Sequence, residues 1–459
     1  MKIVIEGAGE IGSHLAKMLR AEANDVTVID NDTRRLAALS GYADVETYLG
    51  NPSSIKSLRE AGVARADLFI AVYPFTTQEV NIVGALLAKQ LGAKKVIARI
   101  NDEDYLAAEN RLLFKEMGIE LMFYPEKSAA DEIVSSLKHV SSSDTMDFAH
   151  GKLQISVFKI DEDSPMVDLR LAEFVQMMTP EETALFRIIA ISREEQTIIP
   201  KFDTKFQFGD LLFTVSKREG MKSIIKYFGK SERAIQRVMI LGGTPIGEMV
   251  ARVLSSQMDS VKIIEKDKDR CITLSEHLPD SVTVVNGDGS NSDFLYEEGI
   301  RDYDAFIALT ESDESNVLSC VVAKKFGIQR TVAEVENIEY IRLAEEMGVD
   351  TVINKKLITA GKIFKFTLSG KARFVKYMSG SSAEIIEYTV APGSAITKKP
   401  LKDINFPANA IIAGVIRGSE SFIAVGDTRI EDYDRVAIFA LPQTIKEIDK
   451  FFKAGGLEE

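Results

Sequence analysis

The sequence has few of the residues that build disulfide frameworks or metal sites. Its two cysteines, Cys271 and Cys320, form no CxxC pair, and its four histidines lack the spacing of metal ligands. We therefore expect neither a disulfide framework nor a metal site. This cysteine usage fits a reducing compartment, and we predict a cytoplasmic protein.

Long apolar runs and long basic runs are also missing. No apolar stretch approaches the roughly 20 residues of a membrane helix, and the chain opens on the strand-like KIVIE without a signal segment. The net charge is −13, from 69 Asp and Glu against 56 Lys and Arg. Nucleic-acid affinity depends on neutralising phosphates with Lys and Arg. We therefore expect a protein that works outside the bilayer and binds no nucleic acid.

The motifs of several enzyme classes are absent as well. The sequence contains no GxSxG, no GxxxxGK[ST], and no tyrosine followed four residues later by a lysine. These absences argue against a serine hydrolase, a P-loop NTPase and a short-chain reductase. We predict that the protein is not an enzyme and that it has no catalytic residues. An NAD-dependent oxidoreductase is the alternative.

The chain contains an internal repeat. GAGEIG at Gly7–Gly12 lies 235 residues before GGTPIG at Gly242–Gly247, and Asp30 has the same spacing to Glu265. Further matches follow in the same order, such as EVNIVGALLAKQLG with ESNVLSCVVAKKFG. Matches at nearly one spacing indicate a duplicated unit.

Each repeat alternates short Val/Ile-rich runs with amphipathic stretches. The runs of the first repeat are KIVIE, VTVID, VETYL, LFIAV and KVIAR. Such a pattern predicts an α/β fold with a doubly wound parallel sheet. A β-rich segment follows each repeat, and helical connectors are expected near Pro125–Asp147 and Lys355–Lys371. We predict two Rossmann-like domains, each followed by a small β-rich α+β domain: residues 1–140, 148–230, 235–357 and 372–459.

The first glycine motif predicts a dinucleotide site, because it follows a strand and opens a helix. Gly7 permits a tight turn, Gly9 lets the backbone approach a pyrophosphate, and Gly12 lets helix and strand pack closely. The free N–H groups at the start of the helix face the phosphates. Asp30, at the end of the second strand, suits the ribose hydroxyls and favours NAD over NADP. The turn residues of this candidate site are Gly7, Ala8, Gly9, Glu10, Ile11 and Gly12.

The second motif departs from this pattern. Thr244 replaces the second glycine and hinders a close phosphate, and Pro245 removes one N–H donor. Glu265 keeps an acidic ribose partner, so a nucleotide could bind here. The sequence favours neither a filled nor an empty second site.

Two further candidates follow strands of the first repeat. Arg99 ends the fifth strand, where a guanidinium could clamp phosphate oxygens, and its counterpart is Glu334. The alternative for Arg99 is a solvated arginine at a strand end. Asn51 follows the third strand, where it could reach the adenosine half or serve as an ordinary turn residue.

The whole chain resembles the TrkA family, which is built from RCK domains. The segment PGSAITKKPLKDINFPANAIIAGVIRGSESFIAVGDTRIEDYDRVAIF carries the clearest similarity, whereas the first β-rich segment has FDT in place of GDT. The resemblance transfers a nucleotide-binding role to Gly7, Gly9, Gly12, Asp30 and Arg99. The departures at Thr244 and Glu334 leave binding by the second repeat undecided.

The resemblance also implies ligands, partners and a function. The ligand is NAD(H), with ATP or ADP as further possibilities, and the chain forms a homo-oligomer, as a dimer, tetramer or ring. It docks on the inner face of the cell membrane as a peripheral protein, on a potassium-translocating integral membrane subunit of the TrkH/TrkG type. Nucleotide binding then gates potassium uptake. A soluble nucleotide sensor with a non-transport partner is a further alternative.

Overall fold

The structure is a computed structural model that describes residues 1–73, 78–137, 142, 144–148, 151–194, 196–229, 234–364, 366–367, 372–377 and 383–453. The chain divides into two compact units. One comprises Met1–Ala130 with Lys355–Thr367, and the other Asp131–Asn354 with Leu368–Glu459. Three predicted domain ends, at residues 140, 230 and 459, lie outside the described residues. The four-domain boundaries therefore stay a prediction.

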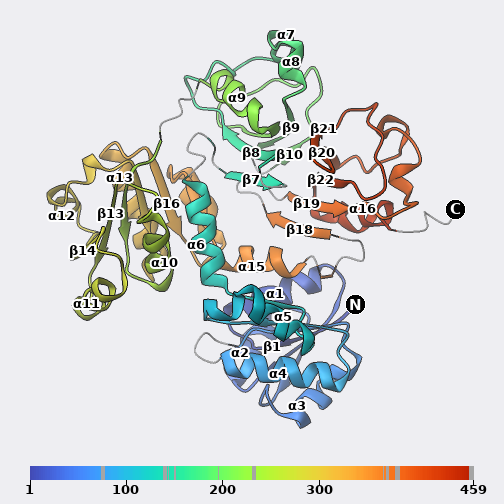
Figure 1. The fold of residues 1–459 in the computed structure, drawn as a ribbon, viewed down its shortest axis with the longest axis vertical. Helices are drawn as coiled ribbons and strands as arrows, with labels where there is room; N and C mark the ends of the chain where they lie inside the picture. The colour runs from blue at the N-terminus through green and yellow to red at the C-terminus, as the bar shows by residue number, and fades with distance from the viewer. Residues whose placement is uncertain are drawn as a thin grey trace. The chain divides into compact units, whose positions relative to one another are not determined.

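The first Rossmann-like domain is built on a parallel sheet (Figure 1), whose strand order reverses at β1. All residues of β4 and most of β1 are buried, as expected of strands covered on both faces. The strands, in spatial order, are β3 (Glu46–Leu49), β2 (Asp25–Asp30), β1 (Lys2–Glu6), β4 (Leu68–Ala71), β5 (Lys95–Arg99) and β6 (Leu121–Phe123). The helices are α1 (Glu10–Ala21), α2 (Thr33–Tyr42), α3 (Ile55–Glu60), α4 (Gln78–Leu91), α5 (Ala108–Glu116) and α6 (Pro125–Ser136).

The second Rossmann-like domain repeats this strand order, which confirms the duplication. Its strands, in spatial order, are β14 (Val282–Asn286), β13 (Ser260–Glu265), β12 (Arg237–Leu241), β15 (Ala305–Ala308), β16 (Arg330–Glu334) and β17 (Thr351–Ile353). Its helices are α10 (Pro245–Leu254), α11 (Lys268–His277), α12 (Ser292–Glu297), α13 (Asp313–Lys325) and α14 (Glu339–Glu346). The connector helix α15 (Lys355–Phe364) follows.

Each β-rich domain is an antiparallel sheet with short helices, so the predicted fold class is confirmed. The first sheet has the order β10 (Gln196–Ile198), β9 (Phe186–Arg193), β11 (Leu211–Lys217), β8 (Leu153–Lys159) and β7 (Asp144–Phe148). The second has the order β18 (Ala372–Tyr377), β19 (Glu384–Thr389), β22 (Arg435–Ala440), β20 (Ala410–Arg417) and β21 (Glu420–Ile423). The helices are α7 (Leu171–Met177), α8 (Pro180–Thr183), α9 (Met221–Tyr227) and α16 (Ile445–Phe451).

One part of the expected connector over residues 125–147 is wrong. Helix α6 ends at Ser136, and β7 begins at Asp144 and pairs with β8. Met146 and Phe148 of β7 alternate with polar residues and are buried in the core. This period of two suits a strand and explains why the segment joins the sheet.

The two β-rich domains share one hydrophobic core. Phe213 of β11 and Phe439 of β22 are fully buried, and their ring centroids lie 5.0 Å apart. Polar contacts join the same two domains, for example from Lys152 Nζ to the carbonyl of Ser419 at 2.8 Å. A common core of this kind couples the folding of the two domains.

The matching aspartates of the two β-rich domains have the same partners. Asp210 binds the guanidinium of Arg193 through both carboxylate oxygens, each at 2.7 Å. Asp434 binds Arg417 in the same way, at 2.9 and 2.8 Å. Both carboxylates are buried, and each also accepts a backbone N–H, from Gln207 and Glu431 respectively, so equivalent bidentate pairs hold the loops that follow the FDT and GDT sequences.

Candidate nucleotide-binding site

The glycine turn of the first Rossmann-like domain has no room for side chains. Gly7 adopts φ +105°, in the region that favours glycine, and a Cβ there would lie 2.8 Å from the Cα of Tyr73. A Cβ on Gly12 would lie 1.9 Å from the carbonyl oxygen of Gly7. Both positions therefore require glycine, and the turn lies where the strand order reverses, which is where doubly wound sheets bind ligands.

Within the part of the chain that the structure describes, the first turn of α1 has no side-chain cap. Gly9 is the N-cap residue and accepts the N–H of Ser13 through its carbonyl at 2.8 Å, but it offers no side chain to the helix end. The uncapped N–H groups and the positive end of the helix dipole suit a pyrophosphate. This cradle fits the phosphates of a dinucleotide.

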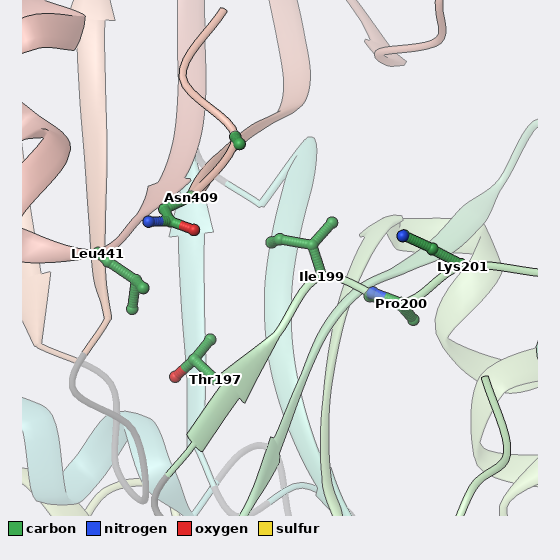
Figure 2. A pocket seen from close by; sticks show the side chains of 7 residues that line it. Thr197, Ile199, Pro200, Lys201, Asn409 and Leu441 are labelled. Carbon is green, nitrogen blue, oxygen red and sulfur yellow. The ribbon is translucent and has the colours of Figure 1, made fainter.

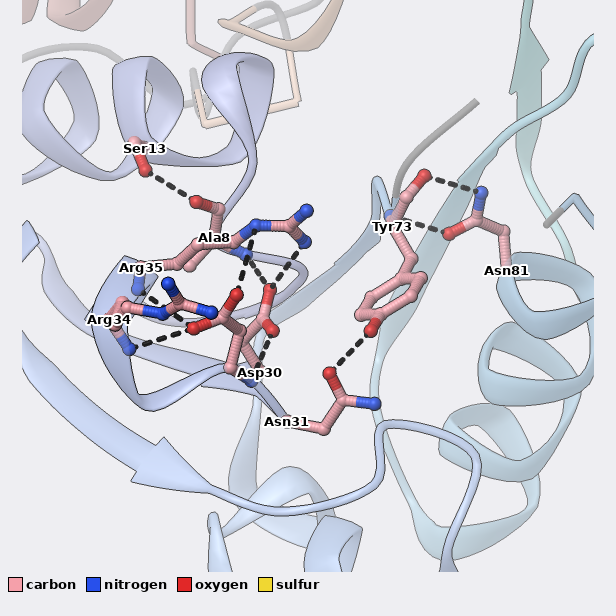
Figure 3. A network of polar contacts seen from close by, with 9 residues as sticks. Ala8, Ser13, Asp30, Asn31, Arg34, Arg35, Tyr73 and Asn81 are labelled. Atoms are coloured by element: carbon pink, nitrogen blue, oxygen red, sulfur yellow. Dashed lines mark hydrogen bonds and ion pairs between the residues drawn. The ribbon is translucent and has the colours of Figure 1, made fainter. Parts of the chain in front are cut away.

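Asp30 lies at the end of β2 beside the glycine turn (Figure 3). Its buried carboxylate accepts the backbone N–H of Ala8 at 2.7 Å and that of Asp32 at 2.8 Å. The guanidinium of Arg35 lies 3.9 Å from the same carboxylate. Asp30 is thus held in one orientation and shapes the turn, in addition to the ribose-binding role that we predict for it.

A tyrosine beside Asp30 connects the segments that follow β4 and β2. Tyr73 follows β4, and its hydroxyl donates to the side chain of Asn31, which follows β2, at 2.6 Å. The amide of Asn81 on α4 binds both the N–H and the carbonyl of Tyr73. Neither Tyr73 nor Asn31 was identified from the sequence, and their position after the strands flanking β1 was the available signal.

Arg99 ends β5 but is not solvated. Its Nη2 lies 2.8 Å from Glu126 at the start of α6, and both side chains are buried. Glu126 could not be identified from the sequence, because its segment is typical of a connector helix. A phosphate contact of Arg99 stays a prediction, and the buried pair with Glu126 positions the guanidinium.

Asn51 has the geometry of a turn residue. It is exposed after β3, and its side-chain oxygen accepts the N–H and the hydroxyl of Ser53 at 3.0 and 2.9 Å. Its predicted contact with the adenosine half is not tested by this arrangement and stays a prediction.

In the second Rossmann-like domain, the protein's own side chains cap the start of α10. The hydroxyl of Thr244 accepts the N–H of Gly247 at 3.3 Å, and Pro245 occupies the first helical position without an N–H. The guanidinium of Arg270 donates to the carbonyl of Gly243 at 2.6 Å and pairs with Glu248 at 2.8 Å. These contacts use or remove groups that a phosphate would need.

Glu265 nevertheless holds the glycine turn of the second domain in the same way as Asp30 holds that of the first. It accepts the N–H of Gly243 at 2.6 Å and that of Asp267 at 2.8 Å. An acidic residue at this position thus holds the turn with or without a ligand. Nucleotide binding through Glu265 stays a prediction.

A separate pocket lies between the two β-rich domains (Figure 2). It has a volume of about 340 Å³, and Lys201 is the one charged side chain among its described lining residues. It has neither a glycine turn nor a helix N-terminus, so the candidate nucleotide site remains in the first Rossmann-like domain. The lining residues are Thr197, Ile199, Pro200, Lys201, Ala408, Asn409 and Leu441.

Comparison with known families decides the relationship. The TrkA-N domain matches residues 3–125 and again 238–355, and the TrkA-C domain matches 155–229 and 385–453. The chain belongs to the TrkA family. The two matches of each domain coincide with the repeat seen in the sequence and in the sheets.

TrkA relatives align over their full length. The chain is 35% identical to "Trk system potassium uptake protein TrkA homolog" of Archaeoglobus fulgidus, covering 99% of this chain and 100% of the relative. It is 34% identical to "Trk system potassium uptake protein TrkA homolog 1" of Methanosarcina mazei, with the same coverage. Among solved structures, "GsuK channel bound to NAD" has a TM-score of 0.60 at 16% identity, covering 98% of this chain and 78% of that one. This last likeness concerns the fold.

Within the described ranges, no helix has the length and apolarity needed to cross a membrane. The same ranges contain no group of three or more His, Cys, Asp or Glu arranged to hold a metal ion.

Proposed function

We propose that this chain is the nucleotide-binding regulatory subunit of a potassium-uptake transporter. The observation that carries the proposal is the uncapped glycine cradle beside Asp30, in a chain that belongs to the TrkA family over its whole length. The chain would act from the inner face of the cell membrane on a separate potassium-translocating membrane subunit of the TrkH/TrkG type. It would bind nucleotide without turning it over.

NAD(H) is the proposed ligand, with ATP or ADP as the alternative. A carboxylate at Asp30 suits ribose hydroxyls and repels a 2′-phosphate. Gly7, Ala8, Gly9, Glu10, Ile11 and Gly12 would supply the phosphate turn, Arg99 a phosphate contact and Asn51 a contact with the adenosine half. Glu265 would be the ribose partner only if the second repeat binds a nucleotide as well. The solved channel with the similar fold is described as bound to NAD, which agrees with this choice.

We also propose that the chain assembles with copies of itself, as a dimer, tetramer or ring. Large apolar side chains are exposed at matching positions of the two Rossmann-like domains, on α4 and α13, on α5 and α14, and directly after α5 and α14. Exposed apolar groups that recur in both repeats support a repeated contact between chains. These residues are Val83, Leu113 and Met117 in the first domain, and Leu318, Leu343 and Met347 in the second.

Gating follows if two shapes of the assembly bind nucleotide with different affinity. Binding then shifts the population toward the shape with the tighter site. A shift from 1:99 to 99:1 requires about 5.5 kcal/mol of differential binding. Several identical sites in one assembly can contribute to this total.

Tracer uptake in cells tests the proposal. Cells lacking this chain should take up rubidium, a potassium analogue, more slowly, and the wild-type chain should restore the rate. The purified chain should show no sustained oxidation of NADH with a panel of carbonyl compounds. Uptake that is indifferent to the chain would contradict the transport role, and steady NADH oxidation would favour the oxidoreductase.

A further inference from the structure

We propose that Lys356 contacts the phosphates of the nucleotide bound by the first Rossmann-like domain. This inference rests on the proposed nucleotide site and adds a residue from the far end of the sequence. It makes the site composite, built from the first repeat and from the connector helix that follows the second.

Helix α15 belongs to the same compact unit as the first Rossmann-like domain and contacts α1. Lys356, in its first turn, places Nζ 3.4 Å from the carboxylate of Glu10. Glu10 is the first residue of α1 and directly follows the uncapped Gly9. The ammonium group therefore lies at the helix end that the phosphates are expected to approach.

The two partners of this ion pair differ in exposure. The side chain of Lys356 is 18% exposed, whereas that of Glu10 is 62% exposed. The surrounding protein thus holds the lysine in place, while the glutamate is free to turn into solvent. An ion pair with one solvent-exposed partner contributes little, and a pyrophosphate is a stronger partner for the ammonium than the exposed carboxylate of Glu10.

A histidine near the start of α1 is affected by the positive charge of Lys356. His14 lies one turn after Glu10 and is half-buried. Burial, followed by the charges of Lys356 and Lys17, lowers the pKa of His14 to about 4. His14 is therefore neutral near pH 7, and Lys356 provides the cation beside the start of α1.

The lysine is specific to the second connector helix. When the Met-Gly pairs that precede β6 and β17 are aligned, Lys356 corresponds to Glu126 of α6. Glu126 is bound to Arg99 in a buried pair, whereas Lys356 pairs with the exposed Glu10. An incoming phosphate would replace Glu10 as the partner of Lys356 and so contact both α1 and α15.

Calorimetric titrations with ADP, NAD⁺ and phosphate-free adenosine test this assignment. Lys356→Gln should weaken ADP and NAD⁺ binding about tenfold or more and leave adenosine unchanged, as expected for a lost charge-assisted contact. Glu10→Gln should tighten ADP binding severalfold, because it removes a competing and repelling carboxylate. Lys356→Arg should retain most of the affinity. Lys17→Gln, which removes an exposed lysine of α1, should change the ADP affinity less than twofold.

Comparing Lys356→Gln with Glu10→Gln distinguishes a ligand contact from a structural ion pair. Both break the pair between Lys356 and Glu10, so a purely structural role would weaken ADP binding equally in both. That outcome, or unchanged ADP affinity in Lys356→Gln, would overturn the assignment while leaving the proposed nucleotide site intact. Wild-type protein that binds neither ADP nor NAD⁺ would overturn both. Melting temperatures of each variant identify loss of fold, and Glu10→Gln still decides the sign if Lys356→Gln is unstable.

Discussion

At the end of β2, the Asp30 carboxylate accepts two backbone N–H groups of the protein, one on each oxygen. Glu265 holds the turn of the second Rossmann-like domain with the same pair of contacts. The acidic residue is therefore required by the turn itself, and its presence alone does not distinguish a binding site from an empty one. The two positions form a natural matched pair for mutation.

Asp30→Asn should weaken NAD⁺ binding by about 1–3 kcal/mol, because it removes the charge from hydrogen bonds to the ribose. Glu265→Gln disturbs an equivalent turn and should leave NAD⁺ affinity unchanged. Calorimetry measures the affinities, and thermal melting checks that both variants fold. Equal losses of affinity in the two variants would contradict the assignment of binding to the first domain.

A second residue-scale prediction concerns Glu6, which ends β1 beneath the glycine turn. Its side chain is fully buried against α4, where a Cβ on Gly84 would lie 2.0 Å from its Oε2. Among the residues that the structure describes, neither carboxylate oxygen has a hydrogen-bond partner. Burial raises the pKa of Glu6 well above its ordinary value of 4.5. The folded chain therefore keeps this acid protonated at pH values where the unfolded chain ionises it.

The stability that Glu6 contributes is thus fully present below about pH 4.5 and is lost as pH rises toward the raised pKa. Glu6→Gln cannot ionise, so its stability relative to wild type should increase between pH 5 and 8. A pKa difference of one unit corresponds to about 1.4 kcal/mol. Urea unfolding of both proteins at several pH values measures the effect, and a constant difference would contradict it.

At the scale of single elements, the start of α1 differs from the start of α10. Gly9 has φ −69° and ψ −175°, close to Thr244 with φ −63° and ψ 168°. Threonine therefore fits the backbone at position 9. Gly9→Thr should keep or slightly raise stability, because its hydroxyl can cap the helix, but it should weaken NAD⁺ binding at least tenfold.

The reciprocal change is the control for this prediction. Thr244→Gly removes the cap of α10 at a cost of a few tenths of a kcal/mol. It should not alter NAD⁺ affinity, since Pro245 still lacks an N–H and Arg270 still binds the carbonyl of Gly243. Affinity that is unchanged in Gly9→Thr would show that phosphates do not use the start of α1.

Most elements could be predicted because their periodicity is strong. The Val/Ile-rich runs predicted five strands of the first parallel sheet, and the glycine turns predicted the first helix of each repeat. The missed strands are short or weakly patterned: β6 and β17 span three residues each, and β7 lies in an expected helical connector. β6 and β17 pair with strands more than 15 residues earlier in the sequence, which a local pattern does not contain, whereas β7 pairs with the adjacent β8.

At the scale of the whole molecule, the shared core of the β-rich domains predicts joint unfolding. Phe439→Ala should cost about 3–5 kcal/mol, because it leaves a cavity against Phe213. Amide hydrogen exchange should then accelerate in both β11 and β22. Phe306→Ala, in the second Rossmann-like domain, should leave these two strands protected. Faster exchange in β22 alone would contradict a common core.

Sequence reasoning reached the candidate site unevenly. It found the glycines and Asp30, because their chemistry is encoded in a short motif and one strand end. It missed Glu126, Lys356 and the bond between Tyr73 and Asn31, because each depends on tertiary contacts between separate elements. The packing of α15 against the first domain could not be predicted from the repeat. The repeat alone suggests that α15 packs against the second Rossmann-like domain, which it follows in the sequence.

Potassium flux into liposomes that carry the cognate membrane subunit tests the central claim most directly. Adding the wild-type chain should make the flux depend on nucleotide, with half-maximal effect near the calorimetric affinity. The Glu265→Gln chain should behave in the same way, whereas the Asp30→Asn chain should require a higher nucleotide concentration. Flux that ignores both the chain and the nucleotide would contradict the account.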